Sequence, residues 1–345
     1  MHKDMASQVV HWQKASGRND LPWQQSQHPY PVWLSEIMLQ QTQVATVLDY
    51  FPRFLQHFPD VASLAAAPLD EVLGLWSGLG YYSRARNLHA CAVRVMEEHG
   101  GSFPRTAQAL QTLPGIGRST AAAIAALCFG ERVAILDGNV KRVLTRLLGF
   151  EADLSVVANE RQLWSLATGL LPRQRLSETM PRYTQGVMDL GATVCTARNP
   201  ACPQCPLAAS CTARRLGSVE HYPVKTRKLK RGSQTIWMLW AQNADGAIWL
   251  SKRPSPGIWA ALYCLPLFDQ RETLLAAVPQ RWRLKLQDTT PVKHALTHKD
   301  LHLHPLRLSL PASATLACEG EWIAAARWPV LGLPAPVRRL LANAQ

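Results

Sequence analysis

The chain has 345 residues and a formal net charge of +13, from 37 Lys and Arg against 24 Asp and Glu. Its length is about twice that of an ordinary single domain, so we expect two domains. A hydrophobic fraction of 47% excludes a disordered chain, and the longest apolar run, residues 121–129, is too short to span a membrane. The excess of cations favours a polyanionic partner. The N-terminus lacks the apolar segment of a secretory signal, which predicts a cytoplasmic protein.

Residues 1–215 are predicted to be all-helical. Apolar residues recur there at spacings of three and four, as in Val72, Leu75, Trp76 and Leu79. Glu36 falls within such a helix, and its helical neighbours Trp33, Leu39 and Gln40 make a largely apolar stripe. Burial there would disfavour the charged carboxylate and make Glu36 a proton donor near neutral pH. The alternative is an ion pair between Glu36 and an arginine elsewhere in the chain.

A helix-hairpin-helix is predicted at about residues 106–129. Two helical segments flank the turn at residues 113–117, and this turn contains Gly115 and Gly117, followed by Arg118 and Ser119. Glycine N–H groups at the start of the second helix can hold a phosphate, because no side chain blocks the approach. The alternative is an ordinary helical hairpin without a ligand.

Asp137 follows twenty residues after Gly117, just before another predicted helix. An Asp in this position usually caps the helix. We predict instead that Asn139, which is closer to the helix start, is the cap. Asp137 would then be free to stabilise positive charge on a sugar held near the hairpin.

Two carboxylates, a phosphate-binding hairpin and a basic chain together indicate cleavage of a glycosidic bond on nucleic acid. One carboxyl protonates the leaving group, and the other stabilises an oxocarbenium-like sugar. The base must leave the stack first, so a side chain has to fill the gap. Gln41, within residues 40–42, and Tyr81, in the glycine-flanked segment 78–84, are the candidates, although buried packing is the usual fate of a tyrosine.

Four of the eight cysteines crowd into seventeen residues with the spacing x6-x2-x5. In a cytosolic chain such a cluster indicates a bound metal or an iron–sulfur cluster rather than disulfides, and the residues alone leave zinc open. The four are Cys195, Cys202, Cys205 and Cys211.

The last part of the chain has a different pattern. Residues 216–232 are predicted to be a linker whose basic run, residues 225–231, is either a solvated tether or a phosphate contact. In residues 233–345 the segments 235–240 and 247–250 predict a β-hairpin, a strand follows near His302, and residues 331–344 predict a closing helix. We therefore expect an α+β domain.

These motifs resemble the endonuclease III superfamily of DNA glycosylases and, within it, the adenine DNA glycosylase family. The resemblance runs through nearly the whole chain and rests on residues 33–42, 78–82, 113–117 and 136–143 and on the four cysteines. It implies an N-terminal all-α helix-hairpin-helix DNA glycosylase fold with one [4Fe–4S] cluster and a C-terminal α+β Nudix-like domain. The implied activity removes adenine mispaired with 8-oxoguanine or guanine from double-stranded DNA, in base excision repair.

The resemblance also implies roles for single residues. Glu36 matches the general acid that protonates adenine at N7, and Asp137 matches the residue that stabilises the sugar cation. The remaining matches are Gln41 and Tyr81 as wedges in the duplex, Gln24 and Gln185 in the adenine pocket, Gly115, Gly117, Arg118 and Ser119 in the DNA-binding hairpin, Thr297 and His298 in 8-oxoguanine recognition, and Cys195, Cys202, Cys205 and Cys211 as cluster ligands.

The sequence departs from the patterns of its relatives in three places. Ser119 stands where bifunctional relatives carry a Schiff-base lysine, which predicts a monofunctional enzyme that uses water. Leu296 replaces the phenylalanine of the family's recognition loop, and no acidic Nudix box follows residues 257–266, so we expect no nucleotide hydrolysis.

A pyrimidine glycosylase and a catalytically inactive damage sensor are the alternative functions. We expect a monomer associated with the nucleoid.

Overall fold

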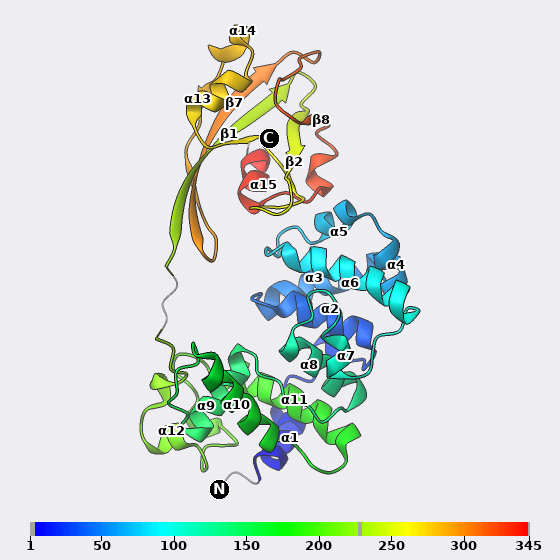
Figure 1. Ribbon diagram of the computed structural model, residues 1–345, viewed down its shortest axis with the longest axis vertical. Helices are drawn as coiled ribbons and strands as arrows, with labels where there is room; N and C mark the ends of the chain where they lie inside the picture. Colours follow the sequence, from blue (N-terminus) through cyan, green and yellow to red (C-terminus); the bar gives the residue numbers. More distant parts are fainter. Residues whose placement is uncertain (1–3, 227–229, 344–345) are drawn as a thin grey trace. The chain divides into compact units, whose positions relative to one another are not determined.

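The computed structural model describes residues 4–226 and 230–343, and the chain divides into two compact units (Figure 1). One unit comprises Met1–Ala65 and Ala90–Lys228, and the other comprises Ala66–His89 and Leu229–Gln345. The domain limits expected at residues 215 and 233 stay a prediction. Residues 227–229 of the expected linker and its basic run, like Met1 to Lys3, lie outside the described residues.

Within residues 4–65 and 90–226 every regular element is helical, as predicted. Over the whole described part of the chain, no helix has the length and apolar character needed to cross a membrane. The elements are α1 (Met5–Ser16), η1 (Pro22–Gln24), α2 (Pro29–Leu39), α3 (Val44–His57), α4 (Val61–Ala66), α6 (Ser83–His99), whose first residues belong to the second unit, α7 (Ala107–Leu110), α8 (Arg118–Phe129), α9 (Gly138–Leu148), α10 (Val157–Gly169), α11 (Leu176–Thr193), η2 (Cys202–Gln204), α12 (Thr212–Arg215) and η3 (Val219–His221).

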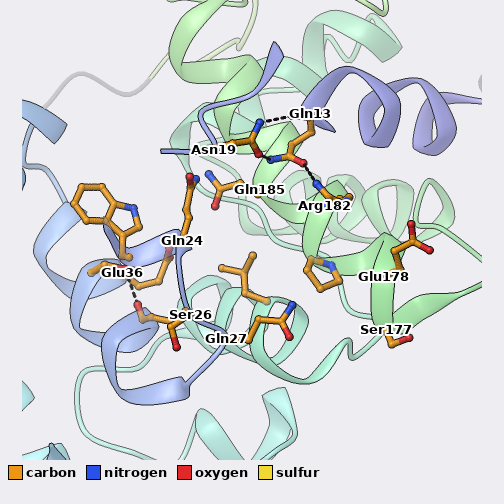
Figure 2. A pocket seen from close by; sticks show the side chains of 15 residues that line it. Gln13, Asn19, Gln24, Ser26, Gln27, Glu36, Ser177, Glu178, Arg182 and Gln185 are labelled. Carbon is orange, nitrogen blue, oxygen red and sulfur yellow. Dashed lines mark hydrogen bonds between the residues drawn. The ribbon is translucent and has the colours of Figure 1, made fainter. Parts of the chain in front are cut away.

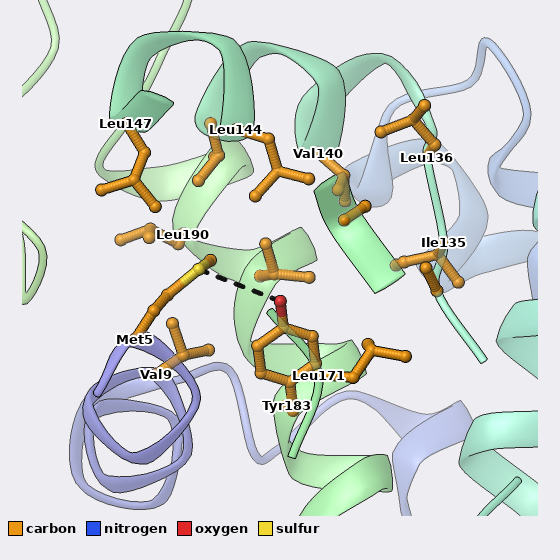
Figure 3. Packing of buried hydrophobic residues seen from close by; sticks show 14 of the residues in the cluster. Met5, Val9, Ile135, Leu136, Val140, Leu144, Leu147, Leu171, Tyr183 and Leu190 are labelled. Atoms are coloured by element: carbon orange, nitrogen blue, oxygen red, sulfur yellow. Dashed lines mark hydrogen bonds between the residues drawn. The ribbon is translucent and has the colours of Figure 1, made fainter. Parts of the chain in front are cut away.

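The apolar faces of α1, α9, α10 and α11 form one core (Figure 3). Met5 and Val9 of α1 pack against α11, where the Tyr183 hydroxyl lies 4.0 Å from the sulfur of Met5. Leu144 and Leu147 close the core from α9. Each buried side chain of this size contributes ~1.5–3 kcal/mol to the free energy of unfolding. This core fixes the position of α11 and therefore of the polar residues that α11 carries.

The helix-hairpin-helix is present, with α7 and α8 joined by a tight turn. Gly115 has a φ of 75°, a conformation that only glycine adopts without strain. Gly117 is the N-cap of α8, and a Cβ added there would meet no atom within 4 Å. The first turn of α8 is therefore open to an approaching anion.

The second unit contains α5 (Leu69–Leu75), the start of α6, and a mixed sheet. The two long strands, β1 (Gly232–Asn243) and β7 (Lys299–Leu310), pair in parallel from Gly232↔Lys299 to Asn243↔Leu310. The sheet order is β3-β2-β1-β7-β5, with β4 paired to β1, β6 to β7 and β8 to β2. The shorter strands are β2 (Ile248–Lys252), β3 (Tyr263–Cys264), β4 (Leu267–Phe268), β5 (Gln287–Asp288), β6 (Val292–Ala295) and β8 (Glu321–Ile323).

Helices cover both faces of this sheet because β1 alternates two sets of buried side chains. Met238 and Trp240 pack in the core that includes α15 (Ala335–Ala342), and Leu239 and Ala241 pack in the core that includes α13 (Arg271–Ala277) and α14 (Gln280–Arg283). The short turn η4 (Trp328–Val330) precedes α15. The predicted hairpin is confirmed as β1 and β2. The predicted closing helix is too long, since Pro334 is its N-cap and residues 331–334 are not helical.

Segment 66–89 is joined to the C-terminal segment by polar contacts within the second unit. Lys252 pairs with Asp70 at 2.6 Å, and the Tyr82 hydroxyl donates to the carbonyl of Leu333 at 2.8 Å. Arg86 donates to the carbonyl of Ala260, also at 2.8 Å. Tyr82, at the end of the turn 78–82, thus has a partner in the C-terminal segment.

Helices α11 and α9 approach closely at Gly191. A Cβ added to Gly191 would lie 2.7 Å from the Cβ of Asn139 and 3.0 Å from its carbonyl oxygen. Arg142 reinforces this contact by donating to the carbonyl of Gly191 at 2.5 Å and to Oδ1 of Asn139 at 2.8 Å. The first turn of α9, which begins directly after Asp137, is therefore positioned by α11.

We predict that Gly191→Ala destabilises the protein, because the new methyl group collides with backbone atoms that cannot move freely. The expected loss is ~1–3 kcal/mol, as for other overpacked sites, measured by thermal or denaturant unfolding. Gly169→Ala, at the end of α10, is the matched control because its Cβ would meet nothing within 4 Å. Equal unfolding midpoints for the two variants would contradict the close approach.

Candidate active site

A cavity of about 490 Å³ opens in the helical unit between α2, η1 and α11 (Figure 2). Its walls include Trp23, Gln24, Glu36, Leu127, Arg182 and Gln185. Most of its lining side chains are polar, and Trp23, Val32 and Leu127 add apolar surface. The structure thus brings three of the predicted site residues, Gln24, Glu36 and Gln185, to a single cavity.

Glu36 is the acidic group of this cavity on α2. Burial, together with the nearby charge of Asp137, raises the pKa of its carboxyl to about 7. Glu36 makes no ion pair with any described residue, so the alternative of a partner arginine is not realised. At neutral pH a large share of the Glu36 carboxyl is protonated and able to donate a proton.

Asp137 caps α9, contrary to the prediction that Asn139 is the cap. Its Oδ1 accepts a hydrogen bond from the backbone N–H of Val140 at 2.7 Å, while the side chain of Asn139 accepts from Arg142. Asp137 rather than Asn139 has the extended backbone that an N-cap requires. Capping holds the carboxylate at the positive end of the helix. Burial raises the pKa of Asp137, and the Val140 and Asn139 N–H groups oppose this shift.

Ser119 connects the hairpin to Asp137. Its hydroxyl accepts a hydrogen bond from the backbone N–H of Leu136 at 3.1 Å, so the first turn of α8 holds the residue before Asp137. Arg118 is exposed, and its guanidinium lies 3.9 Å from the ring centre of Trp164. The predicted hairpin residues therefore lie together, with Gly117 open in front of α8.

The two amide side chains predicted to line the pocket, those of Gln24 and Gln185, differ in their hydrogen-bond partners. Both amide atoms of Gln24 are buried and find no hydrogen-bond partner among the described residues. Gln185, on α11, donates from Nε2 to Oδ1 of Asp189 at 2.9 Å. A buried amide without a partner is costly, so Gln24 is suited to a ligand that supplies both a donor and an acceptor.

Gln41 and Tyr81, the predicted wedges, are both exposed and strained. Their φ angles are 56° and 46°, in the left-handed region that costs ordinary residues ~1–3 kcal/mol. Gln41 follows α2 in the helical unit, and Tyr81 lies in the second unit. Buried Arg84 holds the turn of Tyr81 by donating to the carbonyl of Leu79 at 3.1 Å. Such strain at exposed side chains is typical of functional positions.

A second cavity, of about 640 Å³, lies within the second unit. Thr297 and His298 form its wall at the turn between β6 and β7, and the hydroxyls of Thr297 and Tyr81 are 3.3 Å apart. Trp259 lines the same cavity, with a φ of 58° and its ring 6.0 Å from that of His294. The structure thus places Tyr81, Thr297 and His298 around one cavity.

The four clustered cysteines line one small cavity beside the buried side chain of Arg146. Arg146 donates to Sγ of Cys195 at 3.4 Å, and backbone N–H groups donate to Cys205 and Cys211. All eight cysteines of the chain are described and are free thiols. In the described part of the chain no three His, Cys, Asp or Glu side chains are placed to hold a single metal ion. Four thiols with N–H donors and a cation fit an iron–sulfur cluster, whose negative charge they offset.

Sequence reasoning missed several residues that support these sites. It did not single out Asp189 and its partner Arg18, Arg146 beside the cysteines, or Trp259 in the second cavity. The available signal was the helical spacing of Asp189 and Arg146, each of which falls on the apolar face of its helix. A charged residue on such a face needs a buried partner.

Comparisons with protein-family models divide the chain in three. The HhH-GPD superfamily base excision DNA repair protein family matches residues 34–168. The iron-sulfur binding domain of endonuclease III matches residues 195–211, which are the four-cysteine segment. The NUDIX domain matches residues 237–343. These matches confirm the predicted fold class of both parts and the iron–sulfur segment.

Curated proteins and solved structures show the same similarity. The chain is 36% identical to an adenine DNA glycosylase of Buchnera aphidicola from Acyrthosiphon pisum over 99% of this chain and 98% of that protein. It is 48% identical to the human adenine DNA glycosylase over 57% of this chain and 37% of that protein. A thermostable thymine-DNA glycosylase structure matches with a TM-score of 0.55 and 28% identity, over 62% of this chain and 97% of that chain. An endonuclease III–DNA complex, 22% identical with a TM-score of 0.52 over 63% of this chain and 98% of that chain, shows the same fold.

The raised pKa of Glu36 predicts how stability depends on pH. The folded carboxyl titrates near 7, against ~4.3 in the unfolded chain. Its protonation therefore favours folding at low pH, and this contribution is lost as pH rises from ~4.3 to about 7. Glu36→Gln should unfold at a higher temperature than the wild type, by an amount that grows over this window and is then constant. At ~1.4 kcal/mol for each pH unit between the two pKa values, the gain is ~3–4 kcal/mol.

Asp153→Asn is a control of opposite sign, because hydrogen bonds from Thr226 and Ser155 lower the pKa of Asp153 to about 2. Its carboxylate stabilises the fold above the unfolded pKa of ~3.9, and the contribution is lost as pH falls toward about 2. The variant should thus be less stable than the wild type at neutral pH. A pH-independent difference between Glu36→Gln and the wild type would show that Glu36 titrates normally.

Proposed function

Since this chain belongs to the adenine DNA glycosylase family and is a DNA N-glycosylase, a hydrolase, we propose that it removes adenine mispaired with 8-oxoguanine or guanine. The observation that carries the proposal is the carboxyl of Glu36, with a pKa of about 7, in the wall of a cavity of about 490 Å³. A cavity of this size accommodates a purine, and a half-protonated carboxyl in its wall is suited to general-acid catalysis.

In the proposed reaction Glu36 donates its proton to N7 of the extruded adenine. The N-glycosidic bond then breaks, and the bonding electrons leave with the base. Asp137 stabilises the positive charge that develops on the sugar, and water adds to the sugar carbon while its proton returns to the Glu36 carboxylate. The N–H donors at the start of α9 favour the ionised form of Asp137, which this role requires.

The hairpin and the two strained side chains are proposed to hold the DNA. Gly115, Gly117, Arg118 and Ser119 offer backbone N–H groups, a helix N-terminus and a cation to the phosphates. Gln41 and Tyr81 would enter the duplex, and their exposed positions support this assignment. Such wedges replace the stacking that an extruded base leaves.

Ser119 supports a monofunctional enzyme. A hydroxyl cannot form an imine with the sugar, and the Ser119 hydroxyl is already bonded to the N–H of Leu136. The enzyme would therefore leave an abasic site and an unbroken strand.

The second cavity is proposed to recognise 8-oxoguanine. Thr297 and His298 provide a hydroxyl and an imidazole at its edge, and Tyr81 contributes a ring. Leu296 lacks the aromatic ring of the family's phenylalanine, but Trp259 lines the same cavity and offers an aromatic face for a base. The position of Trp259 supports lesion recognition despite the substitution at residue 296.

We further propose that Cys195, Cys202, Cys205 and Cys211 hold one [4Fe–4S] cluster. The cluster would join the segment that follows α11 to Arg146 of α9, and we assign it no step of the base removal. A monomeric state, cytoplasmic location and association with the nucleoid stay predictions from the sequence.

The proposal predicts a defined substrate preference. With labelled duplexes under single-turnover conditions, the wild type should cleave adenine opposite 8-oxoguanine and opposite guanine, but not thymine opposite guanine or oxidised pyrimidines. Glu36→Gln and Asp137→Asn should retain DNA binding while the rate falls by ~10² or more, as expected for loss of a general acid or of an electrostatic partner. Cleavage of the pyrimidine substrates alone would replace the proposal with a pyrimidine glycosylase.

The pH profile and the strand product provide internal controls. The wild-type rate should fall as pH rises above about 7, because Glu36 loses its proton, and Glu36→Gln should lack this decline. Strand breaks should appear only after alkali or heat, and borohydride should trap no protein–DNA adduct. Efficient trapping would overturn the monofunctional assignment.

The cluster proposal predicts iron in the purified protein. Anaerobically prepared wild type should be yellow-brown, with about four iron atoms per chain as a [4Fe–4S] cluster requires. Cys202→Ser should lose most of this iron and bind DNA weakly, whereas Cys318→Ser, outside the four-cysteine segment, should keep it. Zinc without iron in the wild type would contradict the proposal.

A further inference from the structure

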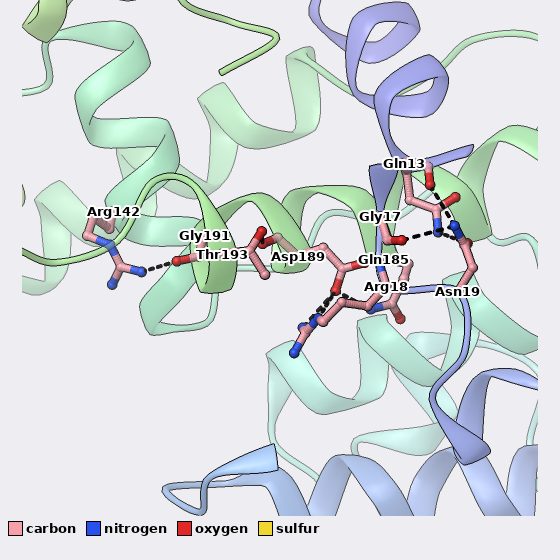
Figure 4. A network of polar contacts seen from close by, with 9 residues as sticks. All are labelled: Gln13, Gly17, Arg18, Asn19, Arg142, Gln185, Asp189, Gly191 and Thr193. Carbon is pink, nitrogen blue, oxygen red and sulfur yellow. Dashed lines mark hydrogen bonds and ion pairs between the residues drawn. The ribbon is translucent and has the colours of Figure 1, made fainter. Parts of the chain in front are cut away.

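Asp189 lies on α11 one turn after Gln185, and its carboxylate is fully buried (Figure 4). Arg18 approaches it with three groups. The backbone N–H donates to Oδ2 at 3.1 Å, Nε donates to Oδ1 at 2.7 Å, and Nη2 lies 2.6 Å from Oδ1. Gln185 completes the shell by donating Nε2 to Oδ1 at 2.9 Å. Arg18 and Gln185 thus bind the carboxylate of Asp189.

The charge of Asp189 determines which end of the Gln185 amide faces it. An ionised carboxylate only accepts hydrogen bonds, so the amide nitrogen must point toward Asp189. Burial raises the pKa of Asp189, and the guanidinium of Arg18 opposes this shift by donating from Nε and Nη2 to Oδ1. The amide oxygen of Gln185 is consequently the end left for the cavity, which Gln185 lines.

Other amides of this cavity have different partners. Gln13 and Asn19, near the rim, bond to one another at 2.8 Å, and Arg182 donates to Oε1 of Gln13 at 3.1 Å. Gln24 has no partner among the described residues and can present either end of its amide. Gln185 differs from them because the carboxylate of Asp189 binds its amide nitrogen, which leaves the amide oxygen for a ligand.

We propose that Asp189 is a positioning residue that, together with Arg18, forces Gln185 to present a hydrogen-bond acceptor to position 6 of the bound purine. This inference rests on the proposed function. Adenine carries an amino group at that position, which donates, whereas hypoxanthine and guanine carry a carbonyl, which accepts. A 6-oxo purine would place its oxygen against Oε1 of Gln185, and that unpaired contact disfavours it.

The test compares adenine and hypoxanthine opposite the same partner base, in otherwise identical duplexes. Single-turnover rates are measured for the full-length wild type and for Asp189→Asn. Asparagine keeps the shape of aspartate, but it can donate as well as accept, so the Gln185 amide is free to turn over. We expect the wild-type preference for adenine over hypoxanthine to fall by about tenfold or more in the variant, the scale of one hydrogen bond.

The preference ratio separates positioning from structural damage. Thr193→Val is the matched control on α11, since it removes only a hydroxyl that donates to the Asp189 carbonyl at 2.8 Å. It should leave the ratio unchanged. Parallel loss of both rates in Asp189→Asn, with the wild-type ratio kept, would overturn the positioning role.

A second variant covers the case in which Asp189→Asn does not fold. Gln185→Met keeps the length of the side chain and the charge of Asp189, and it removes the acceptor, so it should lower the same ratio. An unchanged ratio in Gln185→Met would also overturn the proposal. Failure of the proposed function is distinguishable, because then the wild type itself would not cleave the adenine duplexes.

Discussion

The close packing of α11 against α1 and α9 is the constraint on which the site depends. Gly186 faces Val9 and Gln13 of α1, where a Cβ would lie 2.8 Å from Val9 and 2.9 Å from Gln13, and Gly191 faces Asn139 at the start of α9. Without side chains at these two positions, α11 comes close enough to hold the pocket wall on one side and the helix that Asp137 caps on the other. The segment with the clustered cysteines then begins two residues after α11 ends.

Three buried carboxyls of this unit show three ways of tolerating a charge away from water. A large share of the Glu36 carboxyl is protonated at neutral pH, since burial and Asp137 raise its pKa to about 7. Burial also raises the pKa of Asp137 and of Asp189, and this shift is opposed by helix N–H groups at Asp137 and by Arg18 at Asp189. These three chemically similar side chains therefore differ in the partners that act on their charge.

The second unit places a strained turn against a cavity of its own. Arg84 holds the turn that contains Tyr81 by donating a hydrogen bond to the carbonyl of Leu79. Tyr82 and Arg86 donate hydrogen bonds to backbone carbonyls of the C-terminal segment. The hydroxyl of Tyr81 meets that of Thr297 from the β6–β7 turn. A ligand in this cavity would therefore contact Tyr81 and the β6–β7 turn together.

Sequence by itself determined the features that depend on neighbours along the chain. The hairpin at Gly115 and Gly117, the four-cysteine spacing and the apolar stripe around Glu36 are local patterns, and the structure contains each of them. The cap of α9 was predicted wrongly, because its choice between Asp137 and Asn139 depends on backbone angles that tertiary contacts set. Only the tertiary structure decided the orientation of Gln185, since Arg18 and Asp189 meet across 171 residues of chain. A buried charge needs a partner, but the sequence does not say which one the fold will bring to it.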